Sequence, residues 1–143
     1  MKIERIALTA AAGAEITIPI CCADWVMINW IALTLVTDAN AANRQPSLNF
    51  LQTGKPTIQL PLIQTTYLTA SLTQKMFMGR RFPFSAGLTP QWNFTAPLPT
   101  PFMFESDVAV ISTTANLQAG DVWTAQAEFI RLLEPELEMV AFW

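Results

Sequence analysis

Histidine is absent from this chain. It is the commonest general base in enzymes, the usual partner of a nucleophilic serine or cysteine, and the commonest zinc ligand. Carboxylates are scarce as well, because Asp and Glu together number 11 in 143 residues, and no spacing pairs two of them as glycosidase chemistry requires. These absences argue against most hydrolase mechanisms. We expect a protein that is not an enzyme and that uses no cofactor and no metal.

Glycine and cysteine supply no obvious site either. The five glycines stand isolated along the chain, so they predict no phosphate-binding loop. The two cysteines, Cys21 and Cys22, are adjacent and cannot link distant parts of a fold. We expect them to be reduced, buried hydrophobic residues, as in a reducing cytoplasm. Asp38, Asn40 and Asn43 approximate a calcium loop but contain one carboxylate, so a capped turn is the better interpretation.

Charge is also low. Charged residues make up 13% of the chain and hydrophobic residues 52%, whereas a typical soluble domain has about 25% charged residues. Such a surface exposes apolar patches, which mark sites of association, so we expect an assembly of identical chains, with a trimer favoured. The net charge of -3 predicts no nucleic-acid partner. The longest apolar stretch, residues 25–36, is too short for a membrane-spanning helix, so no membrane partner is expected.

What the chain does contain is a pattern of strands and turns, with alternating, β-branched and aromatic residues broken by Pro, Gly and Asn. This pattern predicts an all-β fold, an antiparallel β-sandwich. Pro61 predicts an edge position for its strand, because proline cannot donate to the ladder. The first two expected strands could pair as a hairpin. The expected strands are residues 2–9, 15–20, 25–37, 46–51, 56–64, 67–74, 107–112 and 122–133, with a helix as the alternative for 67–74.

In two of these strands, the sequence pattern predicts which face of the sheet each side chain occupies. Residues 25–37 are apolar on both alternating faces, so we expect a loop, a neighbouring sheet or another subunit to cover the second face. Three of the tryptophans, Trp25, Trp30 and Trp123, are expected in the core. The final strand is expected to direct Trp123, Ala125, Ala127 and Phe129 inward and Thr124, Gln126 and Glu128 outward.

Residues 82–104 form a proline-rich aromatic segment that is incompatible with a helix and too apolar for a disordered linker. We interpret it as a structured loop or arm that packs on the sandwich or on a partner. An acidic spacer follows the last strand, and the apolar chain end either frays or docks on a neighbouring subunit. The chain therefore divides into a β-sandwich domain, residues 1–134 including the arm, and a C-terminal tail, residues 135–143.

Interface residues are expected among the few arginines and among the aromatic side chains of the arm and the tail. Arginine favours interfaces because its planar guanidinium pairs bidentately with carboxylates and stacks on aromatic rings. A solvated side chain or an internal ion pair is the alternative for each arginine. The candidates are Arg44, Arg80, Arg81, Trp92, Phe102, Phe104, Phe142 and Trp143.

Two turn segments resemble those of a known class of proteins. Residues 33–44 end in Thr-Asp-Ala-Asn-Ala-Ala-Asn-Arg after a long strand, and residues 117–123 read Leu-Gln-Ala-Gly-Asp-Val-Trp before the final strand. Both segments resemble the small virion structural proteins of tailed bacteriophages. The resemblance implies a jelly-roll-like β-sandwich that is made in the host bacterial cytoplasm and located in the virion. It also implies the major capsid protein or other virion proteins as partners.

Three functions are compatible with these features. The first is a capsid decoration or cement protein that stabilises the head shell by oligomeric packing. The second is a head-to-tail adaptor, a fibre base or another tail component. The third is a carbohydrate- or receptor-binding β-sandwich in which Trp92 or Trp143 stacks on sugar rings. We favour the first, because low charge and missing chemistry both indicate a protein that acts by packing.

Overall fold

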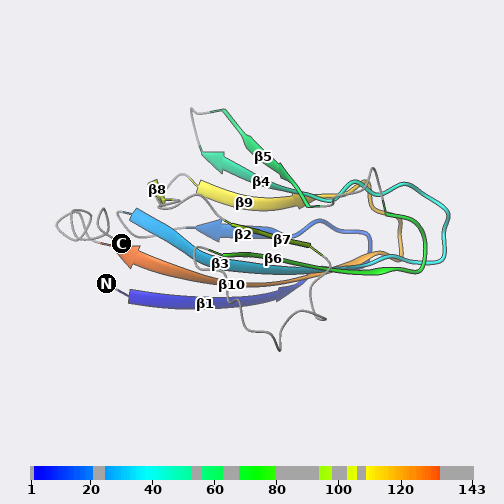
Figure 1. Ribbon diagram of the computed structural model, residues 1–143, viewed down its shortest axis with the longest axis horizontal. Helices are drawn as coiled ribbons and strands as arrows, with labels where there is room; N and C mark the ends of the chain where they lie inside the picture. Colours follow the sequence, from blue (N-terminus) through cyan, green and yellow to red (C-terminus); the bar gives the residue numbers. More distant parts are fainter. Residues whose placement is uncertain are drawn as a thin grey trace.

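The computed structural model describes residues 2–20, 25–52, 56–62, 68–79, 94–97, 103–105 and 109–132. All the regular secondary structure in these ranges is β-strand, and two sheets face each other as layers of a sandwich (Figure 1). The prediction of an all-β sandwich is therefore confirmed. Within the described ranges, no helix has the length and hydrophobicity needed to cross a membrane.

The larger sheet, called the front sheet here, has the strand order β1-β10-β3-β6-β7, with β8 paired beside part of β3. Its pairs are antiparallel except the parallel pair of β6 and β7. The back sheet has the order β2-β9-β4-β5 and is wholly antiparallel. The front strands are β1 (Lys2–Thr9), β3 (Trp25–Val36), β6 (Thr73–Gly79), β7 (Phe94–Pro97), β8 (Met103–Glu105) and β10 (Val122–Leu132), and the back strands are β2 (Thr17–Ile20), β4 (Ser47–Gln52), β5 (Ile58–Pro61) and β9 (Ala109–Thr114).

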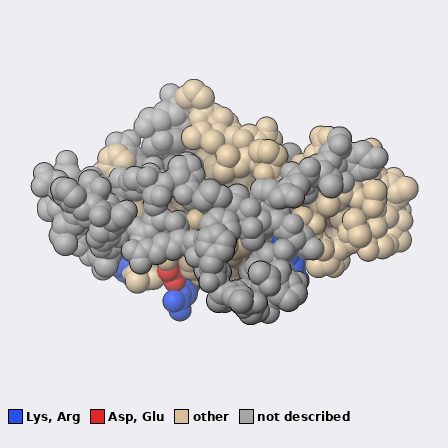
Figure 2. Space-filling model, viewed as in Figure 1, with Lys and Arg blue, Asp and Glu red and all other residues tan. Residues whose placement is uncertain are grey.

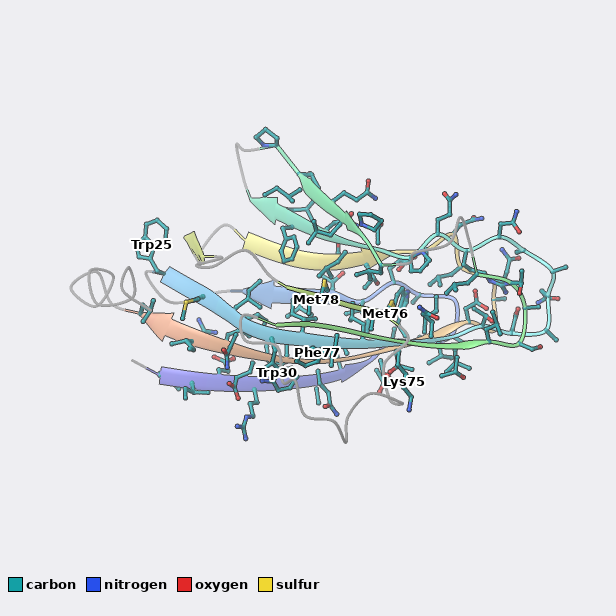
Figure 3. All side chains as sticks on the ribbon, viewed as in Figure 1. Trp25, Trp30, Lys75, Met76, Phe77 and Met78 are labelled. Atoms are coloured by element: carbon teal, nitrogen blue, oxygen red, sulfur yellow. The ribbon has the colours of Figure 1, made fainter. Side chains whose placement is uncertain are left out.

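The core lies between the two sheets and follows the alternation of the strands. The inward residues of β10 are buried as predicted, and Trp123 is fully buried among them. Met76 and Met78 of β6 point into the same space, whereas Phe77 and Lys75 lie on the opposite side of the sheet (Figure 3). The back sheet contributes Leu48 and Phe50 of β4, Ile18 of β2 and Leu62 next to β5.

A β-bulge in β3 changes which residues face the core. Glu128 of β10 pairs with Trp30, but the next residue, Phe129, pairs with Ile28, so Asn29 is the extra residue. The core side of β3 therefore changes from even to odd residues: Val26 and Ile28 before the bulge, and Ile31, Leu33 and Leu35 after it. Strict alternation was the wrong assumption for this strand, because one inserted residue reverses the faces on either side of it.

The opposite, outer face of the front sheet is also apolar at one end. Met27, Ile130 and Leu132 form a second buried cluster there, with Trp25 packed against it. Trp30 lies on the same face and stacks on Phe77, with ring centroids 6.2 Å apart. The expectation of core positions was therefore wrong for Trp25 and Trp30, which are only half-buried. The expectation that the second face of β3 is covered holds for Met27, which is fully buried.

Most of the expected strands are present, and two predictions about them were wrong. The first two strands do not form a hairpin, because β1 pairs with β10 in the front sheet and β2 pairs with β9 in the back sheet. Residues 67–74 are not one strand. Leu68 forms an isolated bridge to Arg44, Ser71 has a positive φ of 55°, and the strand begins only at Thr73. The edge position predicted from Pro61 is confirmed, since β5 is the last strand of the back sheet.

Candidate functional site

Arg44 lies at the loop end of the sandwich, where the turn after β3 meets the turn before β10. Its Nε donates to Oδ2 of Asp121 at 2.8 Å, and its Nη2 donates to Oδ1 of Asp121 at 2.9 Å and to Oδ1 of Asp38 at 2.7 Å. Its Nη1 donates to the carbonyl oxygens of Asn40 and Ala42, both at 2.9 Å. A guanidinium has five N–H groups, so every donor of this side chain is used within the chain.

The two carboxylates are held in turn by backbone N–H groups. Asp121 accepts from the backbone N–H of Asp38 at 2.7 Å and of Gln118 at 2.9 Å. Asp38 accepts from the backbone N–H of Asn40 and of Gly120, each at 3.0 Å. Both turns are therefore fixed by the same three ionised side chains, which we call the arginine network: Arg44, Asp38 and Asp121.

Burial and hydrogen bonding act in opposite directions on these carboxylates. Burial alone would raise the pKa of Asp121, but the Arg44 guanidinium and the N–H groups of Gln118 and Asp38 outweigh it and hold that pKa below its ordinary value. The pKa of Asp38 is lowered in the same way, against its own burial, by the N–H groups of Asn40 and Gly120. The hydrogen bonds that Arg44 donates to Asp121 raise the pKa of Arg44, against the effect of its burial. All three groups are therefore ionised at neutral pH.

This geometry corrects one of the predicted interface residues. The Arg44 side chain is fully buried, so it does not reach a partner in this fold, and the alternative of an internal ion pair is the one that holds. The turn around Asp38 and Asn40 is a capped turn, because Asn40 donates both its backbone N–H and its side-chain Nδ2 to the Asp38 carboxylate. Among the described residues, no group of three or more His, Cys, Asp or Glu could hold a metal ion.

Of the remaining predicted interface residues, only Phe104 lies within the described ranges. Phe104 is part of β8, where its backbone pairs with Val26. Arg80, Arg81, Trp92, Phe102, Phe142 and Trp143 lie outside the described residues, as do the tail and most of the arm. The interface predictions for these residues remain predictions.

The outer face of the front sheet carries a shallow hollow of about 440 Å³. Its floor is a row of cross-strand neighbours, in which Thr9 pairs with Thr124, Thr124 with Thr34, and Thr34 with Lys75. Small side chains, including Ala7 and Ala32, leave the space above the sheet open. The row contains three threonine hydroxyls and the Lys75 ammonium, and none of the described lining residues is a carboxylate.

Two ion pairs bind β1 to β10, one on each face of the front sheet. Arg5 donates from Nε to Oε2 of Glu128 at 2.7 Å, and Asn29 of the bulge donates to Oε1 of the same carboxylate at 2.5 Å. The hydrogen bond from Arg5 lowers the pKa of Glu128. Arg131 likewise pairs with Glu4 at 2.5 Å. Glu128 faces outward as predicted but is buried, because Arg5 and Asn29 cover it.

The described surface is poor in charge and includes large apolar side chains. Figure 2 shows few blue or red side chains on the visible face, and most of its described surface is tan. Among the described residues, six large hydrophobic side chains are exposed. They lie on the edge strands β1 and β5, near the ends of the interior strands β3 and β4, and just before β6. They are Ile3, Leu8, Val36, Leu51, Ile58 and Leu72, with Ile3 the most exposed at 57%.

The comparisons with known proteins identify no family for this chain. No family model and no curated protein matches the chain. One similar solved structure is that of the infectious bursal disease virus Gx strain, at 11% sequence identity and a TM-score of 0.32. The match covers 96% of this chain and 42% of that one, so this chain spans less than half the length of its structural neighbour. At this distance the likeness carries no argument about function.

Proposed function

We propose that this chain is a virion structural protein with a jelly-roll fold, which acts without catalysis by packing against other copies of itself and against a capsid. In its specific form, the proposal is a decoration or cement protein that stabilises the head shell. The order in which its strands pair is the observation that carries this proposal.

The strands pair as if one long hairpin had been wrapped into a sandwich. From the two ends of the chain toward the middle, β1 pairs with β10, β2 with β9, β3 with β6, and β4 with β5. The wrapping then places β10 beside β3 and β9 beside β4. This pairing order, in eight strands that form two four-stranded sheets, supports a jelly-roll topology, with β7 and β8 as additions between β6 and β9.

Jelly rolls occur in viral capsids, in lectin domains and in cupins. The chain has no histidine for metal binding or acid–base chemistry. Low overall charge and exposed apolar residues on the edge strands favour a protein that functions in contact with other proteins. These features support a capsid role over the other uses of the fold.

Packing of this kind needs no chemistry. Each 100 Å² of apolar surface buried between subunits contributes about 2.5 kcal/mol before the entropy of association is subtracted. The arginine network supports such a role by fixing two long turns, so that the loop end of the sandwich presents a constant shape.

The test is to purify the particles made by the host that encodes this chain and to measure its copy number by gel densitometry. A decoration protein is expected at about one copy per capsid subunit position, hence in the hundreds. Particles that lack the chain should assemble and then lose their contents at a lower temperature than intact particles. Absence of the chain from purified particles would refute the virion role, and a copy number near a dozen would replace decoration by a neck or tail role.

A further inference from the structure

We infer that β1 is an open sheet edge that pairs with β1 of a second copy of this chain, antiparallel and about a two-fold axis. The pairing would join two front sheets into one continuous sheet. The inference rests on the edge geometry alone and not on a role in a virion.

Prolines lie on both edge strands of the back sheet, β2 and β5. Ile16 accepts from the N–H of Thr113, so the even residues of β2 face β9 and Pro19 stands at an outward position. Leu62 donates to the carbonyl of Pro46, so Pro61 of β5 likewise stands at an outward position. At each of these positions proline removes the N–H that an added strand would need. At the far side of the front sheet, β7 ends in Pro97 and β8 has three residues.

Strand β1 has no such protection. It is eight residues long, contains no proline, and pairs only with β10 among the described strands (Figure 1). Ala10 donates to the carbonyl of Trp123, and the register with β10 is unbroken. The even residues of β1 therefore direct their backbone N–H and C=O groups toward β10. Ile3, Arg5, Ala7 and Thr9 therefore direct four N–H and four C=O groups outward.

Charged side chains can also guard an edge, but those in the middle of β1 are directed away from it. Arg5 is paired with Glu128, and Glu4 is paired with Arg131, so both are held toward β10. Ile3 is the most exposed large hydrophobic residue in the described part of the chain, and Leu8 is exposed at the other end of the strand. The edge thus carries an exposed apolar side chain near each end and paired charges in the middle, with the exposed Lys2 at its first position.

A second copy of β1 uses all four outward residues of this edge in one register only. With the two-fold axis at Ile6, all four outward residues are used, because Ile3 pairs with Thr9 of the other copy and Arg5 with Ala7. Glu4, held by Arg131, then lies opposite Leu8, and no like charges oppose each other. Moving the axis to Arg5 would place two arginines face to face, and moving it to Glu4 would do so for two glutamates.

The experiment uses the purified full-length chain in light scattering coupled to size exclusion, over a range of micromolar concentrations. The wild-type chain is expected to show a concentration-dependent species of twice the chain mass, or a multiple of that pair. Ala7→Pro removes an N–H that the isolated fold does not use, so it should leave the circular dichroism spectrum unchanged and shift the chain to monomer. Ala7 is chosen because its side chain is small and exposed.

Two substitutions of opposite charge at the same position serve as a matched control that does not depend on proline. Ala7→Lys would oppose Arg5 of the other copy and should weaken dimerisation about fivefold, whereas Ala7→Glu should not weaken it. Amide hydrogen exchange gives a second readout. The N–H groups of Ile3, Arg5, Ala7 and Thr9 should be protected in the wild-type dimer, and those of Ile3, Arg5 and Thr9 should be exposed in the Ala7→Pro monomer.

A wild-type chain that stays monomeric, or an oligomer that both Ala7→Pro and Ala7→Lys leave intact, would overturn the inference. A trimer that resists these substitutions would do so as well, because two-fold pairing of β1 produces even-numbered assemblies. Neither result touches the virion role, which is decided by the composition of purified particles.

Discussion

Arg44 and Asp121, 77 residues apart in the chain, form a two-point ion pair in which neither side chain is exposed to solvent. The pair joins the two turn segments that carried the resemblance to small phage virion proteins, residues 33–44 and 117–123. Each segment is ordinary turn chemistry when taken alone. Their contact explains why one supplies an arginine and the other an aspartate.

Replacing Arg44 with methionine should reduce the free energy of unfolding by about 3 to 5 kcal/mol, because it leaves buried carboxylates without their counter-ion. Urea denaturation followed by circular dichroism measures this change. Lys2→Met, at an exposed position, is the control and should change stability by no more than about 0.5 kcal/mol. Equal effects of the two substitutions would contradict the central role of the arginine network.

Gly120→Ala should destabilise the same end of the sandwich by about 1 to 3 kcal/mol. A Cβ atom at this position would lie 2.8 Å from both Cβ and Oδ2 of Asp38, so Asp38 would be pushed away from Arg44. Thermal unfolding measures the loss. Ala41→Ser, at an exposed position in the neighbouring turn, should leave the melting temperature unchanged. A neutral Gly120→Ala variant would show that the two turns can separate without cost.

Between neutral and acid pH, stability should change only at the acid end. The pKa values of Asp38, Asp121, Glu4 and Glu128 are lowered by the fold, so their stabilising contribution is complete above their ordinary values, which are 3.8 for Asp and 4.5 for Glu. That contribution is lost as the pH falls through the lower folded values. Denaturant midpoints should therefore be nearly flat between about pH 5 and 7, where a histidine would titrate in most proteins. A midpoint that changes strongly across that interval would disagree.

Deleting Asn29 should be far more harmful than replacing it. Without the extra residue, residues 25–28 would turn their apolar side chains to the opposite face, and Val26 and Ile28 would leave the core. The loss should exceed about 4 kcal/mol, which approaches the whole stability of a marginal domain. Asn29→Ala keeps the bulge and removes one hydrogen bond to Glu128, so it should lose about 1 to 2 kcal/mol by the same denaturation measurement. Similar losses in both variants would argue that the bulge does not set the faces of β3.

Much of the fold was readable from local pattern. The limits of β1 were predicted to the residue, the inward face of β10 was predicted as found, and Pro61 gave the edge position of β5. These features depend on residues close together in the chain, for which alternation and the missing N–H of proline are sufficient signals. The bulge at Asn29 left no such signal, because both faces of β3 are apolar in its sequence.

The sequence by itself determined a β-rich chain with little charge, no histidine and no pattern of catalytic groups, since composition and alternation are properties of single residues and their neighbours. Only the tertiary structure decided that Arg44 is an internal residue, that Arg5 and Glu4 are turned toward β10, and that β1 is the edge of the front sheet among the described strands. Those facts depend on pairings between residues as much as 127 positions apart. Strand alternation indicates which residues avoid water. The strand with which each strand pairs, and the direction in which a charged side chain points, are fixed only when distant segments come into contact.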